Sequence, residues 1–170
     1  MQEKKKFKEP RKKTYDEEII DIRRVTKVTK GGRNFRFSAV VAAGDRKGKV
    51  GLGTGKANEV PEAISKATNN AVKNMVRISL VENRTIPHEI TARQTGSKVL
   101  LKPALKGTGV KAGGAVRSVV ELAGIKDILT KSLGSSSKIN VAQATFKALK
   151  QQRTIEEVAE IRGKRVEDLV

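Results

Sequence analysis

The sequence contains no cysteine and a single histidine among its 170 residues. Without thiols the protein has no disulfides, no zinc site built from cysteine and no thiol chemistry. One imidazole, His88, also leaves the usual metal-binding and histidine-based catalytic arrangements incomplete. We therefore expect no catalytic residue, no metal and no cofactor, and we expect His88 to have a structural role in a strand.

Aromatic residues and long apolar runs are also scarce. Aromatics make up 3% of the chain, with no tryptophan, so a row of rings that stacks on single-stranded nucleic acid has few candidates. No run approaches the ~20 apolar residues of a spanning helix, and the N-terminus lacks the apolar core of a signal peptide. We expect a cytoplasmic protein without a membrane partner.

Acidic residues are few relative to basic ones. The chain has 18 Asp and Glu against 36 Lys and Arg, a formal net charge of +18. Such an excess repels itself unless a polyanion neutralises it, and the phosphate backbone of nucleic acid is the commonest polyanion. An anionic membrane is the second candidate. Because 37% of the residues are hydrophobic, the chain can fill one modest core or two small ones.

Residues 30–64 are the most informative stretch, and they read KGGRNFRFSAVVAAGDRKGKVGLGTGKANEVPEAI. Alternating apolar residues, typical of a half-buried strand, are Phe35, Phe37, Ala39, Val41 and Ala43. Adjacent glycines predict a primed hairpin turn before them, with Lys30 and Arg33 at its tip. A second turn at residues 44–48 and an edge strand at 17–29 complete a predicted three-stranded antiparallel sheet.

Glycine occupies alternate positions of the third predicted strand, at Gly51, Gly53 and Gly55. Glycine weakens a strand, and the usual reason for it is the close approach of something else. A packed element of the same domain and a bound ligand are equally open explanations. A P-loop is not expected, because Val50 replaces the first glycine of GxxxxGK[ST] and Ala57 replaces its hydroxyl residue.

Residues 58–78 predict a helix that begins near Pro61, since proline is tolerated at the first helical position. Its buried stripe repeats at three- and four-residue steps and consists of Val60, Ile64, Ala67, Ala71, Met75 and Ile78. Three strands followed by one packed helix resemble the core of a double-stranded-RNA-binding domain. That fold recognises shape, phosphate and 2′-hydroxyl groups rather than base sequence.

A predicted linker at Asn83 and Arg84 introduces the second half. The elements predicted after it are a hairpin at 86–102 turned at 95–97, a glycine-rich loop at 103–114, a helix stopped by Gly124, a strand at 125–133, serine N-caps at 135–137, a helix at 139–152 and a capping box at 154–157. Residues 107–112 match the GxGxxA dinucleotide fingerprint, with Asp127 about twenty residues further on. The match lacks its context, because residues 103–106 separate the first glycine from its strand.

We therefore expect an α+β protein in four parts. A disordered basic arm occupies residues 1–15, and a double-stranded-RNA-binding-like N-terminal domain of three antiparallel strands plus a helix occupies residues 16–82. A two-layer α/β C-terminal domain occupies residues 83–153, and a short helical tail occupies residues 154–170.

Several motifs, taken in order, resemble one family. They are KGGRxFxF at residues 30–37, VGxGxGKAxEVPxAI at 50–64, NM at 74–75, GTGxxAGGAxR at 107–117 and ELAG at 121–124. Together they look like bacterial small-subunit ribosomal protein five (the uS-five family) over about residues 16–165, in unbroken order.

This resemblance implies a noncatalytic component of the small ribosomal subunit, located in the cytoplasm within the ribosome and bound to 16S rRNA. The rRNA-binding residues that it implies are Arg23, Arg24, Lys27, Lys30, Gly31, Gly32, Arg33, Arg36 and Lys56. In the family the first hairpin loop lies beside the spectinomycin site, and the corresponding residues here are Val25, Thr26, Lys27, Lys30, Gly31, Gly32 and Arg33. Phosphate contacts of this kind set position rather than sequence specificity.

The resemblance also implies protein partners. The family's second domain meets ribosomal proteins four and eight, and the accuracy-affecting interface with protein four corresponds to Gly109 and Arg117. Subunit assembly, decoding accuracy and the unwinding of mRNA where it enters the subunit are attributed to this neighbourhood. A free-standing double-stranded-RNA binder and a nucleotide-dependent enzyme that uses residues 107–112 remain the alternatives.

Overall fold

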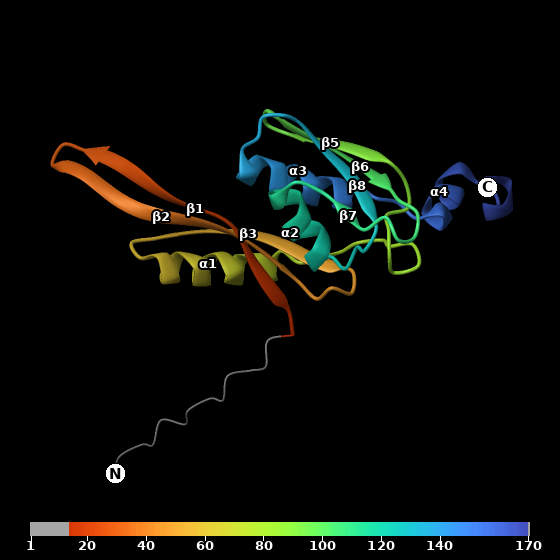
Figure 1. The fold of residues 1–170 in the computed structure, drawn as a ribbon, viewed down its shortest axis with the longest axis horizontal. Coiled ribbons are helices and arrows are strands. Elements are labelled where there is room, and N and C mark those ends of the chain that lie inside the picture. Colours follow the sequence, from red (N-terminus) through yellow and green to blue (C-terminus); the bar gives the residue numbers. More distant parts are fainter. Residues whose placement is uncertain (1–13, 170) are drawn as a thin grey trace, which may run out of the picture.

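The N-terminal half of the protein is an antiparallel sheet with one helix against it (Figure 1). The structure is a computed structural model that describes residues 14–169, so nearly all of the predicted basic arm lies outside the described residues. The sheet has the order β1-β2-β3-β4, with β1 at Asp16–Thr29, β2 at Gly32–Gly44, β3 at Lys49–Ala57, β4 at Val76–Arg77 and helix α1 at Val60–Lys73. The three predicted strands and the helix are confirmed.

The C-terminal half contains a second sheet with the order β5-β6-β8-β7. Its elements are β5 at Ile90–Gln94, β6 at Ser97–Pro103, β7 at Val110–Lys111, α2 at Gly114–Leu122, β8 at Ile128–Gly134 and α3 at Lys138–Lys150. β7 pairs with β8 in parallel, with α2 as the crossover between them. Helix α4 at Ile155–Arg162 and a short 3-10 helix at Val166–Leu169 extend from the far end. The predicted α+β fold is confirmed.

The glycine row of β3 is explained by helix α1. A Cβ atom added to Gly53 would lie 2.1 Å from the carbonyl oxygen of Ala67 and 2.3 Å from the nitrogen of Ala71. Gly51 and Gly55 face backbone atoms of the same helix at similar distances. The helix backbone therefore packs directly on the strand, and of the two explanations left open by the sequence, the packed element of the same domain is correct.

Strand β2 is buried on both faces over its second half, which corrects the prediction of a half-buried strand. Ala39 and Val41 pack with α1, whereas Val40 and Ala42 belong to the core that α2 and α3 share. Phe35, at the other end of the predicted stripe, is 46% exposed. The alternation identified only one of the two buried faces, because the second is covered by residues far away in sequence.

Other local predictions need smaller corrections. Helix α1 ends at Lys73, so Met75 and Ile78 of the predicted stripe lie beyond it. Ser137 occupies the N-cap of α3, but its side chain makes no capping hydrogen bond. The capping box predicted for residues 154–157 is confirmed, with Thr154 and Glu157 exchanging both hydrogen bonds. His88 precedes β5 rather than lying in a strand.

A turn of the first half docks onto the end of α2. The amide of Arg46 donates to the carbonyl of Leu122 at 3.0 Å, and the amide of Gly48 donates to Ala123 at 3.0 Å. The backbones approach so closely that a Cβ atom on Gly44 would lie 2.2 Å from the Leu122 oxygen. One apolar core also includes residues of both halves. The apolar core contains residues from both sides of residue 82, so it does not mark a boundary there. The predicted boundary between the two domains therefore stays a prediction.

Close packing of α1 on β3 gives a stability test. We expect Gly53→Ala to lower the free energy of unfolding by about 3 kcal/mol or more, because the new methyl group overlaps helix backbone atoms that have little room to move. Gly31→Ala is the matched control, since a Cβ atom there meets nothing within 4 Å. Urea denaturation measures both variants, and equal unfolding midpoints would contradict the role given to the glycine row.

Candidate nucleic-acid interface

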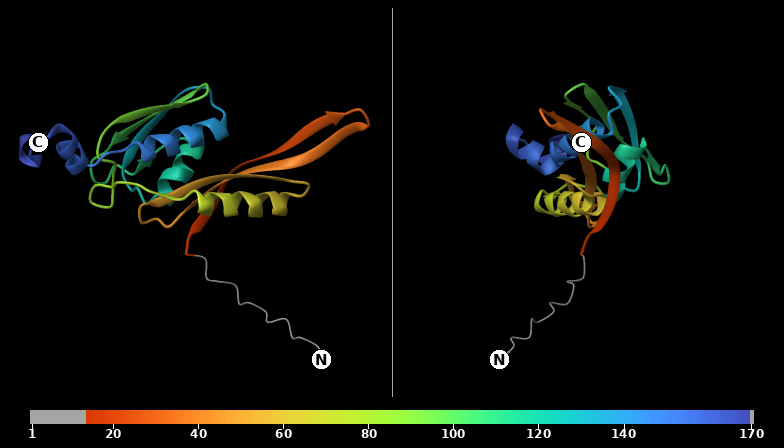
Figure 2. Two further views of the ribbon diagram at one scale, coloured as in Figure 1. Left: turned by 180° about the vertical axis from the view of Figure 1, so that it is seen from behind. Right: turned by 90° about the vertical axis from the view of Figure 1, so that its left-hand side faces the viewer.

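The hairpin of β1 and β2 projects beyond the rest of the N-terminal sheet as a two-stranded ribbon (Figures 1 and 2). Pairing of β1 with β2 continues to Thr29 and Gly32, whereas β3 pairs with β2 only as far as Phe37. Lys30 and Gly31 form the turn at the tip, and all side chains from Thr26 to the tip are exposed. We call residues 23–36 the ribbon.

The tip is a tight hairpin, as predicted, but it is not a primed turn. Primed turns require positive φ at central residues of the turn. Here positive φ occurs at Gly32, with a value of 137°, and Gly32 is already paired with Thr29 in the strand. Neither Lys30 nor Gly31 has positive φ. The turn therefore needs glycine for its backbone conformation at Gly32 and not at Gly31.

The strand register divides the predicted cations between the two faces of the ribbon. Residues paired across an antiparallel ladder point to the same face. From the pairs Arg23–Ser38, Val25–Arg36, Lys27–Asn34 and Ser38–Lys56, one face carries Arg23, Lys27 and Arg36 of the ribbon, and Lys56 lies on the same side in the neighbouring strand β3. The last three of these cations also line a shallow hollow at the ribbon. Arg24 and Arg33 lie on the opposite face, and Lys30 lies at the tip.

Two of the predicted RNA-binding cations already have partners within the chain. Arg23 Nε lies 2.5 Å from Asp21 Oδ2, and the guanidinium of Arg24 lies 3.7 Å from the centroid of the Phe35 ring. Among the described residues, the other predicted cations make no ion pair; they are Lys27, Lys30, Arg33, Arg36 and Lys56. These five exposed charges are therefore available to a polyanion.

Asp21 joins the base of the ribbon to the C-terminal half. Its Oδ1 accepts a hydrogen bond from Lys138 Nζ of α3 at 3.3 Å, while its Oδ2 contacts Arg23. Burial raises the pKa of Asp21, but the hydrogen bonds from Arg23 and Lys138 outweigh burial and hold the pKa below its ordinary value. The carboxylate therefore stays charged and restrains the direction in which the ribbon leaves the body.

The structure brings Gly109 and Arg117 together, away from the ribbon. Arg117, in the first turn of α2, donates to the carbonyl of Val110 at 3.2 Å. Gly109 precedes Val110 and has a φ of 74°, a conformation that favours glycine. Its amide donates to Asp127 Oδ1 at 2.8 Å, and Arg84 Nη1 lies 3.4 Å from Asp127 Oδ2.

Asp127 is the residue whose role the sequence did not identify. The hydrogen bond from the Gly109 amide lowers the pKa of Asp127, Arg84 lowers it further, and burial opposes both. Its spacing from the glycines matched that of a ribose-binding acid, but here the carboxylate holds the glycine loop itself. Residues 104–106 separate the first glycine of the fingerprint from the end of β6, and residues 110–111 within the fingerprint form β7. The strand-to-helix turn that a dinucleotide fingerprint needs is therefore absent here.

Neither a metal centre nor a membrane span is found in the part of the chain that the structure describes. Residues 14–169 contain no group of His, Asp and Glu side chains arranged to hold a metal ion. No described helix is both long enough and apolar enough to cross a bilayer. His88 is engaged with main-chain atoms: its Nδ1 lies 2.9 Å from the carbonyl oxygen of Glu89, and its Nε2 accepts from the Arg153 amide at 3.4 Å.

The fold and this surface define a class of protein: a basic α+β body that carries a projecting cationic ribbon. Comparisons with known proteins give the same result. Residues 15–79 match the family description "Ribosomal protein S5, N-terminal domain", and residues 92–162 match "Ribosomal protein S5, C-terminal domain". The chain is also 56% identical over 156 residues to the small ribosomal subunit protein uS5 of Mycoplasmopsis agalactiae, covering 92% of this chain and 68% of that protein.

The chain belongs to the ribosomal protein S5 family. Members are structural proteins of the small ribosomal subunit that work in translation, and the chain is therefore not an enzyme. The resemblance found from the sequence motifs is confirmed.

The Asp127 network makes stability depend on pH. Because the folded-state pKa of Asp127 lies below the ordinary value of 3.8, its stabilisation is present above that value and is lost as the pH falls through the folded-state pKa. We expect Asp127→Asn to lower the free energy of unfolding at neutral pH and to reduce the further loss between about pH 6 and about pH 3. Urea denaturation across this range measures the effect.

Asp168→Asn is the control for that measurement, because Asp168 is exposed and its side chain makes no hydrogen bond or ion pair among the described residues. Parallel stability curves for Asp127→Asn and the unaltered protein would show that the carboxylate does not hold the loop.

Proposed function

We propose that this chain is a structural component of the small ribosomal subunit that binds 16S rRNA through the ribbon. In this proposal it contacts neighbouring ribosomal proteins through its second half and contributes to subunit assembly. It also contributes to translational accuracy near the decoding region and the path by which mRNA enters. The observation that carries the proposal is the set of five exposed cations that make no ion pair among the described residues: Lys27, Lys30, Arg33 and Arg36 lie on the projecting ribbon, and Lys56 lies on the neighbouring strand β3.

The charge arrangement suits a phosphate backbone. Lys27, Arg36 and Lys56 share one face, so they can contact successive phosphates along one strand or across one groove. Each neutralised phosphate releases condensed counterions, which gives affinity without sequence specificity. Lys30 and Arg33 extend the cationic surface around the tip. Shape and phosphate recognition of this kind is typical of proteins that bind folded RNA.

Gly31 provides independent support for a close partner at the tip. Its φ is not positive, and an added Cβ atom would meet nothing within 4 Å. Nothing in the described part of the chain, residues 14–169, therefore requires glycine at this position, in contrast to Gly53, where the helix backbone leaves no room. A partner whose backbone approaches the tip gives a reason for the missing side chain.

The second proposed interface is the surface around Gly109 and Arg117, with ribosomal protein four as its partner and protein eight as a further neighbour of this half. Gly113 and Gly114, at the start of α2, also have open space where a side chain would be. Arg117 is exposed and lies at a loose 3.8 Å from Glu121, so its guanidinium can exchange this contact for one with a partner's carboxylate.

The ribbon tip gives the direct test of RNA binding. We expect the double variant Lys30→Ala, Arg33→Ala to bind folded 16S rRNA more weakly. Its slope of log affinity against log salt concentration is expected to be shallower by about 2, because two phosphate contacts are lost. Filter binding over a salt series measures both quantities.

The matched control is Lys164→Ala, Arg165→Ala, which removes the same charge from exposed positions after α4. We expect this control to keep the slope of the unaltered protein. If the ribbon variant also keeps that slope, the tip does not belong to the RNA footprint.

The accuracy interface has its own test. We expect Arg117→Ala to weaken association with ribosomal protein four by about tenfold, since a charge-assisted hydrogen bond is lost, and to change misreading in a reporter assay. Lys131→Ala, on the exposed strand β8, is the control with equal charge loss. Unaltered accuracy together with unaltered protein-four binding would remove Arg117 from the interface. Binding of 16S rRNA by the ribbon is measured separately in both variants.

A further inference from the structure

Two adjoining hollows lie where α4 meets the loop that precedes β5. Figure 1 shows α4 at the end of the molecule opposite the ribbon. Both hollows are lined by His88 and Arg153. One has a volume of about 420 Å³ and the other about 750 Å³, which lies in the range of small-molecule sites. Neither hollow shares a residue with the ribbon.

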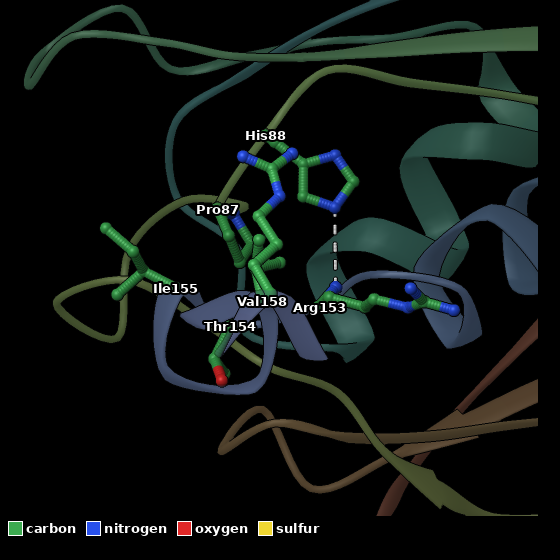
Figure 3. Close-up of a pocket in the computed structure, with 7 residues that line it drawn as sticks. Pro87, His88, Arg153, Thr154, Ile155 and Val158 are labelled. Carbon is green, nitrogen blue, oxygen red and sulfur yellow. Dashed lines mark hydrogen bonds between the residues drawn. The ribbon is translucent and has the colours of Figure 1, made fainter. Parts of the chain in front are cut away.

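The first hollow has apolar walls. Pro87, Ile155 and Val158 line it together with Arg162, and in Figure 3 Pro87 and Ile155 lie to one side of the His88 ring. Ile155 lies at the edge of this hollow and is 44% exposed, so an apolar side chain faces the open space. The His88 ring is held in place, since its Nδ1 must donate to the carbonyl of Glu89 while its Nε2 accepts from the Arg153 amide. A flat, partly apolar ligand can stack here.

The second hollow is cationic. Arg77, Lys150 and Arg153 line it, and none of the three side chains has an ion-pair or hydrogen-bond partner among the described residues. The carboxylate of Glu157 also lines this hollow, and its Oε2 accepts a hydrogen bond from the Thr154 amide at 3.2 Å. Its single negative charge is outnumbered by the three cations. Lys150 has a local explanation in the last turn of α3, where a cation suits the helix dipole. That explanation applies to neither arginine.

Gln152, one of the residues that line the cationic hollow, has a buried acceptor without a partner among the described residues. Gln152 is 6% exposed, and its Nε2 donates to the carbonyl of His88 at 3.2 Å, which fixes the orientation of the amide. Its Oε1 is buried and has no hydrogen-bond partner among the described residues. A buried acceptor of this kind needs a donor, because leaving it unsatisfied costs about 1–3 kcal/mol in protein mutational data. Because this oxygen has less than 1 Å² of accessible surface, the part of the hollow that a ligand can reach is defined by the three cations, which suit an anion.

We propose that the two hollows together bind one ribonucleotide unit. Its phosphate lies among Arg77, Lys150 and Arg153, and its base lies against Pro87, Ile155 and the His88 ring. Figure 3 supports this division, because the side chains of Arg153 and Ile155 point in opposite directions from the chain. The site goes beyond the RNA contact proposed for the ribbon and does not depend on it.

The test is a titration of the full chain with AMP, followed by nuclear magnetic resonance of the backbone amides and the His88 ring. We expect shifts at Arg153, Ile155 and His88. AMP is expected to bind about tenfold more tightly than either adenosine or inorganic phosphate alone, since only AMP fills both hollows.

Surface variants keep the test independent of folding. Arg77→Gln with Arg153→Gln should weaken AMP binding about tenfold or more, because both side chains are exposed and contribute charge rather than packing. Lys98→Gln with Lys131→Gln, at exposed positions of β6 and β8 outside both hollows and outside the ribbon, is the matched control and should leave AMP binding unchanged. The trinucleotide ApApA distinguishes the sources: tighter binding than AMP indicates a strand of RNA, and equal binding indicates a free nucleotide.

Three results would overturn the proposal. AMP that binds no better than inorganic phosphate would reduce the site to a general anion site. AMP binding that survives loss of both arginines, or that shifts no residue of either hollow, would place the ligand elsewhere. Each is distinct from a failure of the ribbon proposal, which is measured by the salt dependence of 16S rRNA binding.

Discussion

The contact between the backbones of α1 and β3 is the constraint on which the other features of the fold depend. Alternate glycines allow the helix to lie directly on the strand, where a methyl group at Gly55 would be 2.3 Å from the Ala63 oxygen. The contact assigns one face of the sheet to α1. The other face, with Val40, Ala42 and Val50, is then left to α2 and α3. The central part of the sheet is consequently buried on both sides.

This double burial explains how a thin ribbon can project from the body. An isolated two-stranded hairpin is only marginally stable in water. Here β1 and β2 are 14 and 13 residues long, and the halves of these strands outside the ribbon, which we call their lower halves, belong to the packed sheet. The lower halves fix the register and the direction of the upper halves, and Asp21 adds a link to α3. Cations at the tip are therefore held away from the core, where a polyanion can reach them without displacing any packed residue.

Helix α2 connects the two halves through the backbone. Its first turn carries Arg117 beside the Gly109 loop, and its last residue, Leu122, accepts a hydrogen bond from the amide of Arg46. Asp127 fixes the Gly109 loop by accepting a hydrogen bond from the Gly109 amide, and its other carboxylate oxygen contacts Arg84. The proposed protein interface is thus built on the same helix that docks against the N-terminal sheet, and both proposed interfaces rest on one continuous core.

The sequence by itself determined the local elements and the character of the surface. Period-two alternation, glycine pairs and the Thr154 capping box located strands, turns and the terminal helix, because each depends on neighbours within a few residues. The net charge and the cations around Lys30 indicated an anionic partner, because charge follows from residue type alone and needs no knowledge of contacts. Only the tertiary structure decided that α1 rather than a ligand fills the space beside Gly53, that Val40 faces a second core, and that Asp127 holds Gly109. Each of these facts is a contact between residues distant in the chain, and no local pattern encodes which distant residue supplies the other side.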